Sequence, residues 1–134
     1  MMRINRWLAK TMLSISLASF CSVGLAKTEK HRILDNQTGV ASYFNDKYHG
    51  QRTASGERYD KNDLTAAHAS LPFGTVIHVV NLKNNQSVDV RVNSRAHRAN
   101  RRLLDLSKRA ARELGFLQAG LANVKITVLR LGEA

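Results

Sequence analysis

Two residues that can carry protons, Glu57 and His68, lie eleven positions apart (68 − 57). Turn residues flank them, since Ser55-Gly56 precedes the acid and Leu71–Gly74, which contains the only proline, follows the histidine. Glycine adopts positive φ at little cost, and proline fixes φ and lacks an N–H, so both segments favour turns. Between them, Leu64–Ala69 is short and mostly apolar, which indicates a buried strand. An acid on a turn beside a histidine on a strand can supply a groove with its polar groups.

Asp105 is a third residue that could transfer a proton. It precedes Ser107, the predicted N-cap of a helix, by two residues. A carboxylate there can also serve only to complement the helix N-terminus. In the same way Glu57 could be a solvated surface residue, and His68 could be a hydrogen-bonded core histidine. The residue types therefore select these three positions without assigning roles to them.

The elements expected to position these residues are mainly strands. Val76–Asn81 is rich in β-branched residues, and Asn84-Asn85 after it favours a turn. Ser87–Asn93 alternates between apolar and polar residues, and Val124–Val128 does so again. The alternation predicts that Asp89 and Arg91 face outward and that three residues face inward, namely Val88, Val90 and Val92.

One helix is predicted, from about Lys108 to Leu114. Ser107 is its N-cap and Gly115 its C′ residue, while Ala110, Ala111 and Leu114 form its buried side. Short strands with a single helix indicate a small closed or partly open barrel.

Six short motifs occur in a fixed order along residues 38–130: Gly39–Phe44 (Gly-Val-Ala-Ser-Tyr-Phe), His49-Gly50, Thr53–Glu57 (Thr-Ala-Ser-Gly-Glu), Leu64–His68 (Leu-Thr-Ala-Ala-His), Leu71–Thr75 (Leu-Pro-Phe-Gly-Thr) and Leu104–Ser107 (Leu-Asp-Leu-Ser). In this order they resemble the rare lipoprotein A family, double-psi β-barrels related to expansins and to lytic transglycosylases of bacterial cell walls. The resemblance implies a mainly β fold over residues 38–131. That fold would be a six-stranded double-psi β-barrel of the expansin and barwin type with one short helix.

The resemblance also implies an activity, the cleavage of peptidoglycan glycan strands between N-acetylmuramic acid and N-acetylglucosamine to leave 1,6-anhydro ends. An aspartate aligned with Asp105 looks like the catalytic acid of related expansins and transglycosylases, so Asp105 is assigned as general acid and base. His68 is expected to orient it by hydrogen bonding, and Glu57 to bind substrate or act electrostatically. Neither a cofactor nor a metal is expected. Five further residues are predicted to bind substrate, with core packing as the alternative for Tyr43: Tyr43, Tyr48, Tyr59, Ser94 and Arg95.

The chain departs from the family pattern at Asn93–His97, which reads Asn-Ser-Arg-Ala-His where the family usually reads Asn-Asp-Arg-Gly-Pro. Ser94 replaces an aspartate often implicated in activity, and it cannot act as an acid. Ala96 replaces the glycine, so a left-handed turn there would either cost about 1 kcal/mol or change shape. Asp105 favours an enzyme, whereas Ser94 favours the alternative, a non-catalytic barrel that binds peptidoglycan or another glycan as expansins do.

The chain is strongly basic, with 21 Lys and Arg against 10 Asp and Glu and a net charge of +11. Such a charge favours a polyanionic partner, and the anionic surface of the cell envelope is expected, with carboxylates in its wall and phosphates in its lipids. No nucleic-acid partner is expected, because the sequence shows neither a reading motif nor a metal cluster. A monomer is expected. Seven basic residues lie between positions 95 and 112: Arg95, Arg98, Arg101, Arg102, Lys108, Arg109 and Arg112.

Residues 1–26 have the features of a signal peptide, with a basic start, an apolar run over 11–23 and small residues at the −3 and −1 positions of a site after Ala26. The run is shorter than the roughly 20 residues that span a bilayer, although a retained anchor is the alternative. Cys21, the only cysteine, follows Phe20, which does not fit a lipoprotein signal. Secretion to the periplasm or cell envelope is therefore expected. Residues 27–37 are polar without periodicity, which predicts a flexible lead-in.

Cleavage is predicted after Ala26. The intact mass of the protein from an envelope fraction should therefore match a chain that begins at Lys27. A mature chain that begins at a lipid-modified Cys21 would contradict this prediction.

Overall fold

The computed structural model describes residues 36–97, 99 and 101–133. The predicted signal peptide and residues 27–35 of the predicted lead-in lie outside the described residues. Gln37, predicted as the last residue of that lead-in, is instead the first residue of a strand and pairs with Ile126. The barrel therefore begins one residue earlier than the motifs indicated.

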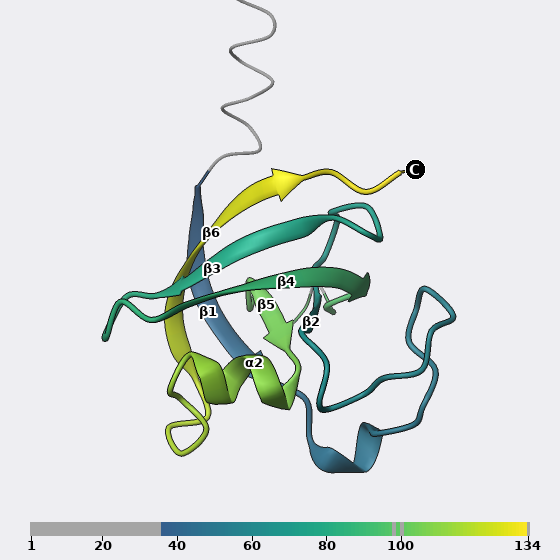
Figure 1. Ribbon diagram of the computed structural model, residues 1–134, viewed down its shortest axis with the longest axis horizontal. Helices are drawn as coiled ribbons and strands as arrows, with labels where there is room; N and C mark the ends of the chain where they lie inside the picture. Colours follow the sequence, from purple (N-terminus) through teal and green to yellow (C-terminus); the bar gives the residue numbers. More distant parts are fainter. Residues whose placement is uncertain (1–35, 98, 100, 134) are drawn as a thin grey trace, which may run out of the picture. The chain divides into compact units, whose positions relative to one another are not determined.

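Within the described residues, six strands close into a barrel in the order β1-β5-β2-β4-β3-β6 (Figure 1). The pairs β1–β5 and β2–β4 are parallel, and the other neighbours are antiparallel. This closed mixed barrel with a short helix confirms the predicted fold class. The elements are β1 (Gln37–Tyr43), η1 (Asp46–Tyr48), β2 (Thr65–Ala67), β3 (Val76–Asn81), β4 (Ser87–Ser94), β5 (Leu104–Leu106), α2 (Lys108–Glu113) and β6 (Ala122–Arg130).

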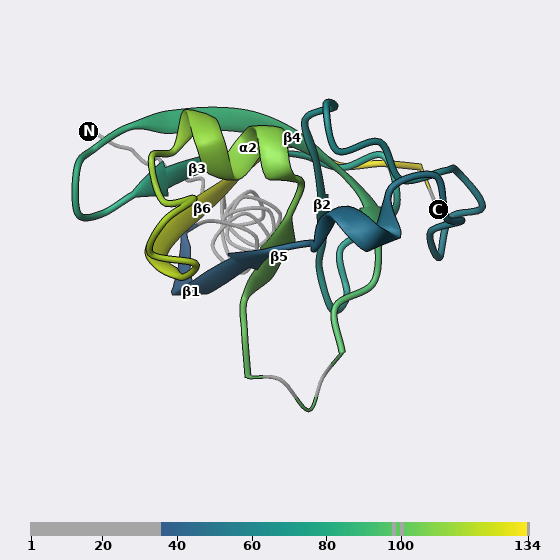
Figure 2. The ribbon, with the colours of Figure 1, turned by 90° about the horizontal axis from the view of Figure 1, so that it is seen from below.

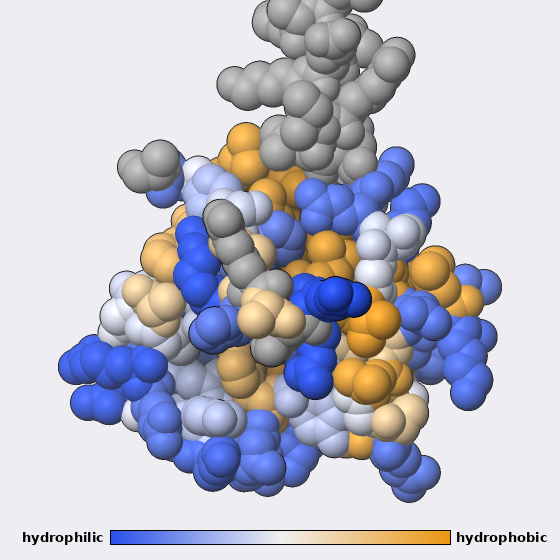
Figure 3. Space-filling model, turned by 180° about the vertical axis from the view of Figure 1, so that it is seen from behind, coloured by the Kyte–Doolittle hydropathy of each residue, from blue (hydrophilic) through white to orange (hydrophobic). Residues whose placement is uncertain are grey.

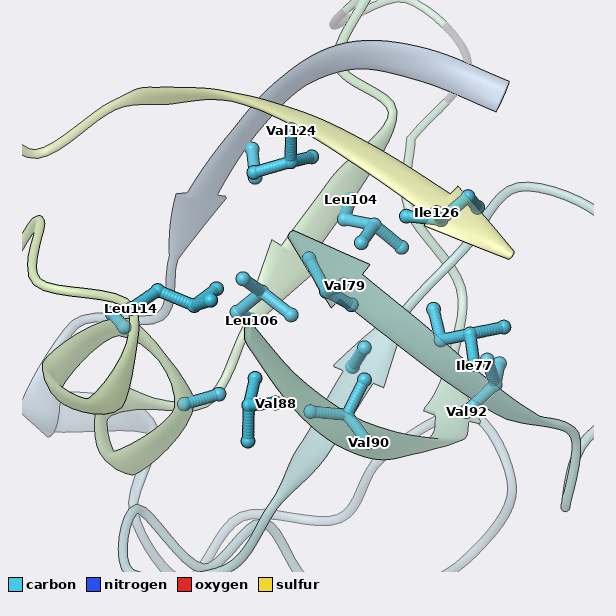
Figure 4. Close-up of a cluster of buried hydrophobic side chains, with 14 of the residues drawn as sticks. Ile77, Val79, Val88, Val90, Val92, Leu104, Leu106, Leu114, Val124 and Ile126 are labelled. Atoms are coloured by element: carbon cyan, nitrogen blue, oxygen red, sulfur yellow. The ribbon is translucent and has the colours of Figure 1, made fainter. Parts of the chain in front are cut away.

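Aliphatic side chains from alternate strand positions fill the barrel interior. The three valines of β4 are buried and Asp89 and Arg91 face outward, as the alternation predicted. β6 is longer than the predicted Val124–Val128, because its ends pair with β1 and β3 although they do not continue the apolar alternation. Figure 4 shows how side chains from several strands and α2 meet in the core, among them Ile77, Val79, Leu104, Leu106, Leu114, Val124 and Ile126.

Ser107 joins the end of β5 to α2 and to the start of β2. Its Oγ accepts a hydrogen bond from the Ala110 N–H at 3.3 Å, which confirms the predicted N-cap. The same hydroxyl donates to the Asp63 carbonyl at 2.6 Å and accepts from the Thr65 N–H at 3.4 Å. Gly115, after the helix, has φ +76°, the left-handed conformation of a C′ residue.

Ser107→Ala should lower the free energy of unfolding by about 1–3 kcal/mol, because it removes an N-cap and leaves buried backbone groups without their partner. Urea denaturation followed by circular dichroism measures the change. Ser87→Ala, at an exposed position at the start of β4, is the control and should stay within about 0.5 kcal/mol of wild type. Equal losses in the two variants would contradict the role given to Ser107.

Candidate functional site

Asp105 lies on the outer surface of the barrel, in a row of residues paired across four strands. It is opposite Ser42 of β1 on one side and Ala67 of β2 on the other, and Ala67 is opposite Ser94 of β4. The two neighbours of Asp105 in β5 point into the core, so Asp105 itself faces outward. Ala67 in this row is fully buried, and the register between β2 and β4 shifts between Ala66 and Ala67. Because adjacent strands lie about 4.8 Å apart, two strand spacings separate the Asp105 and Ser94 backbones by about 10 Å.

The Asp105 carboxyl group is held through one of its two oxygens. The Ser42 hydroxyl donates a hydrogen bond to Oδ1 at 2.5 Å. Arg102 Nη1 lies 3.8 Å from the same oxygen and donates to Ser42 Oγ at 3.1 Å. The side chain is 13% exposed. Within the described part of the chain, both of the contacts made to the carboxyl group itself, from Ser42 and from Arg102, are with Oδ1.

Neither Ser42 nor Arg102 was assigned to the site from the sequence. Ser42 belongs to the opening motif, but only the parallel pairing of β1 with β5 shows that it meets Asp105. Arg102, three residues before Asp105, was counted only as part of the basic segment.

His68 is buried, and its hydrogen bonds fix its tautomer. Nδ1 accepts from the N–H groups of residues 70 and 71, each at 3.1 Å, so Nε2 carries the proton and donates to Gln37 Oε1 at 3.2 Å. Burial lowers the pKa of His68, and the nearby charge of Arg95 lowers that pKa further. His68 is thus a neutral histidine that links β1 to the turn after β2. Its ring bonds are not made with Asp105.

Glu57 forms a two-pronged ion pair with Arg91, with N–O distances of 2.6 and 3.0 Å. These hydrogen bonds hold the pKa of Glu57 below its ordinary value. Glu57 is therefore neither a free acid on its turn nor only a solvated surface residue, since it is paired with Arg91. The Ser55 N–H also donates to the Asn93 carbonyl at 3.3 Å, so this loop lies along β4 beside Ser94.

A small pocket of about 70 Å³ brings together three predicted substrate-binding residues, Tyr48, Tyr59 and Ser94. Phe44, which the sequence did not assign, also lines it, and its ring centroid lies 5.2 Å from that of Tyr59 and 6.0 Å from that of Tyr48. Tyr59 is buried, which raises its pKa, and its hydroxyl accepts from the Lys108 N–H at 3.2 Å. The exposed ring of Tyr48 is the one that can stack on a ligand.

The model of the lytic transglycolase family matches residues 36–126. The chain belongs to this family. The resemblance to rare lipoprotein A proteins and the double-psi β-barrel fold are thereby confirmed.

Several relatives of the family have curated names. The chain is 43% identical over 117 residues to "Endolytic peptidoglycan transglycosylase RlpA" of Neisseria meningitidis serogroup A, covering 87% of this chain and 49% of that protein. It is 44% identical over 96 residues to the protein of the same name from Campylobacter jejuni, covering 72% of this chain and 35% of that protein. The chain thus spans about half or less of the length of these relatives.

Solved structures support the fold. The Streptomyces papain inhibitor is 22% identical with a TM-score of 0.59, covering 71% of this chain and 94% of its own. The apo expansin of Clavibacter michiganensis is 20% identical with a TM-score of 0.57, covering 74% and 52%. At these identities the likeness shows the fold alone.

Two family positions predicted to bind substrate are used for packing. The Tyr43 ring meets Phe116 edge-on with centroids 5.8 Å apart, and its hydroxyl donates to the Leu117 carbonyl at 2.7 Å. Arg95 lies 4.0 Å from the Phe73 ring centroid and donates to the Leu71 carbonyl at 2.7 Å. Both side chains therefore pack against neighbouring segments of the barrel and do not line the aromatic pocket.

Ala96, which replaces the family glycine, does not adopt a positive φ. It is buried, and its N–H donates to the His68 carbonyl at 3.3 Å. The expected cost of a left-handed alanine therefore does not arise, because the backbone takes another path.

The described residues provide neither a cluster of metal ligands nor a membrane-spanning helix. No three His, Cys, Asp or Glu side chains in this part of the chain lie together as metal ligands would. None of its helices is long and apolar enough to cross a membrane.

His68→Asn should reduce the acid sensitivity of the fold. The folded-state pKa of His68 is lowered, so below pH ~6.5 the unfolded chain binds more protons than the folded one. The stability that neutral His68 allows is complete above that pH and is lost as the pH falls toward the folded pKa, by up to about 1 kcal/mol per pH unit. Asn offers a side-chain oxygen to the same N–H groups but does not titrate.

Urea unfolding between about pH 8 and pH 5 measures this dependence. His97→Asn, at an exposed position, is the control and should retain the wild-type profile. An unchanged profile in His68→Asn would contradict the prediction.

Proposed function

We propose that the chain is a lytic transglycosylase that cleaves peptidoglycan glycan strands between N-acetylmuramic acid and N-acetylglucosamine. The observation that carries the proposal is the placement of Asp105, fixed through Oδ1 and facing outward in a row that leads to an aromatic pocket. The curated names of the relatives add support, since they are peptidoglycan transglycosylases.

A single carboxyl group is sufficient for this reaction. The protonated Oδ2 of Asp105 gives its proton to the glycosidic oxygen as the bond from C1 of N-acetylmuramic acid to that oxygen breaks. The carboxylate then takes the proton from the C6 hydroxyl of the same sugar, whose oxygen attacks C1 and closes the 1,6-anhydro ring. The acid is regenerated and no water is consumed, so the second carboxylate of a hydrolase is not required.

Ser42 and Arg102 support this cycle. The Ser42 hydrogen bond occupies Oδ1 and so directs the transferable proton to Oδ2. Arg102 places a positive charge 3.8 Å from Oδ1, where it stabilises the carboxylate that forms after the first proton transfer.

Glu57 and His68 have supporting roles in the proposal. Glu57 lies on the loop along β4 and is held there by Arg91. In the proposal this ionised side chain supplies negative charge near Ser94 and helps to position the substrate. Neutral His68 holds β1 and the turn after β2 together, through its hydrogen bonds to Gln37 and to the N–H groups of residues 70 and 71. In the proposal this fixes the two strands that flank Asp105. Tyr48 supplies the exposed ring for stacking on a sugar.

The proposed location is the periplasm or cell envelope, and the proposed partners are glycan strands and the anionic envelope surface, with the protein as a monomer. The sequence features of residues 1–26 support secretion. Without residues 1–26, which contain Arg3, Arg6 and Lys10, the net charge is +11 − 3 = +8, and this charge favours an anionic surface. Figure 3 shows hydrophilic side chains beside hydrophobic ones on one face of the molecule.

A glycan-binding barrel without turnover is the second candidate. Ser94 favours it, because the family aspartate would place a second carboxylate about 10 Å from the Asp105 backbone along the same row. The likeness to expansin in fold is compatible with either candidate.

Asp105→Asn should reduce the release of anhydro-muropeptides by at least about 100-fold, because a general acid typically contributes that much or more. Glu57→Gln should cost less, and Ser94→Asp should raise the rate if the serine attenuates the enzyme. The measurement is the yield of anhydro products from peptide-free glycan strands by mass spectrometry.

Asp89→Asn is the matched control, since Asp89 is an exposed carboxylate that pairs with His78 on the β3–β4 surface. It should keep wild-type activity. A wild-type rate in Asp105→Asn would refute the assignment of the acid, and activity in Ser94→Asp alone would show that the natural protein is a binder.

A further inference from the structure

A second groove, of about 730 Å³, opens at one end of the barrel. Its walls come from the β3–β4 turn, the segment between α2 and β6, and β1. Leu82 and Leu121 belong to the lining and are unusually exposed for large aliphatic side chains, at 48% and 51%. The lining residues are Val40, Asn81, Leu82, Lys83, Asn84, Gly115, Phe116, Ala119, Leu121, Ala122 and Asn123.

Hydrogen bonds hold the walls in place. The side-chain N–H groups of Asn81 and Asn84 both donate to the Leu114 carbonyl, at 2.8 and 3.0 Å, which ties the β3–β4 turn to the end of α2. The Leu82 N–H donates to the Asn123 carbonyl at 3.0 Å, which ties the same turn to β6. The groove is therefore formed before any ligand arrives.

The groove lies on the same face of β1 as Ser42, which is bonded to Asp105. Val40 lines it and lies two residues before Ser42, so both side chains project from the outer face of β1 about 7 Å apart. Two residues beyond Ser42, Phe44 lines the aromatic pocket. Figure 2 shows the β3–β4 turn and the loop after α2 on one side of β1, and η1 on the other. Asp105, bonded to Ser42, thus lies between two binding surfaces.

The chemistry of the groove differs from that of the aromatic pocket. Its exposed side chains are the aliphatic Leu82, Ala119 and Leu121 together with Lys83, Asn84 and Asn123, and Phe116, the aromatic residue in its lining, is buried. Asn123 is paired with Val40 across β6 and β1, so its exposed carboxamide lies on the same outer face. An aliphatic surface beside an amide suits an acetamido group, which presents a methyl together with an N–H and a carbonyl.

We propose that this groove binds an N-acetylated sugar of the glycan strand, on the opposite side of Asp105 from the aromatic pocket. The proposal rests on the proposed function, whose substrate it extends across the acid. The strand would lie along the outer face of β1, past Val40, Ser42 and Phe44 in turn. Binding surfaces on both sides of Asp105 place the scissile bond within a strand and not at its end.

The test compares two double variants at matched exposed leucines. Leu82→Ser/Leu121→Ser removes the aliphatic surface of the groove. Leu129→Ser/Leu131→Ser is the control, because these residues are similarly exposed, at 54% and 42%, but do not line the groove. Both variants and wild type are assayed for binding to peptide-free and to peptide-bearing glycan strands and for anhydro products, after thermal unfolding has shown that they fold.

The groove variant should bind peptide-free strands at least about fivefold more weakly than wild type, while the control variant binds like wild type. Equal binding by all three proteins would overturn the proposal, even if wild type releases anhydro products. Weaker binding by the groove variant, without turnover by wild type, would support the groove while refuting the enzymatic function. A loss seen only with peptide-bearing strands would overturn the sugar in favour of a stem peptide.

Discussion

The pairing of β5 between β1 and β2 is the constraint on which the site depends. β5 has three residues, and its two leucines are fully buried in the core. Burying each leucine is worth about 1.5–3 kcal/mol, so their orientation is fixed by the hydrophobic effect. Because side chains alternate along a strand, the residue between them must face outward. The position of Asp105 is thus set by its apolar neighbours and not by any contact of its own.

The contacts of Asp105 then determine what the carboxyl group can do. A carboxyl that is mostly shielded from water requires a hydrogen-bond partner, and the Ser42 hydroxyl provides one on Oδ1, while Arg102 donates to Ser42 and lies 3.8 Å from the same oxygen. Glu57 has a different partner, because it forms an exposed two-pronged ion pair with Arg91, which lowers its pKa. The two carboxyl groups are therefore held by different groups, Asp105 by the Ser42 hydroxyl and Glu57 by a guanidinium.

Much of the fold could be predicted from the sequence, but its pairing could not. Alternation identified β4 and its inward valines, and a cap and a glycine delimited α2. In β1, residues 39–42 are small or aliphatic on both faces, so the pattern did not show whether Tyr43 or Phe44 faces outward. Tyr43 was predicted to bind substrate, whereas the structure places Phe44 in the pocket. The pair of Glu57 with Arg91, 34 residues away, is likewise a tertiary contact that no local rule supplies.

The row of residues that contains Asp105 has a consequence for how the protein matures. Its members come from positions 42, 67, 94 and 105, and two of the pairings that join them are parallel, so they require distant segments to meet. Such long-range contacts make folding slow, because chain entropy is lost before the pairing stabilises the fold. β6 closes the barrel against β1 and β3 only after the rest of the chain is available. A chain whose last strand has not yet paired would therefore carry Asp105 without the row of residues that surrounds it in the closed barrel.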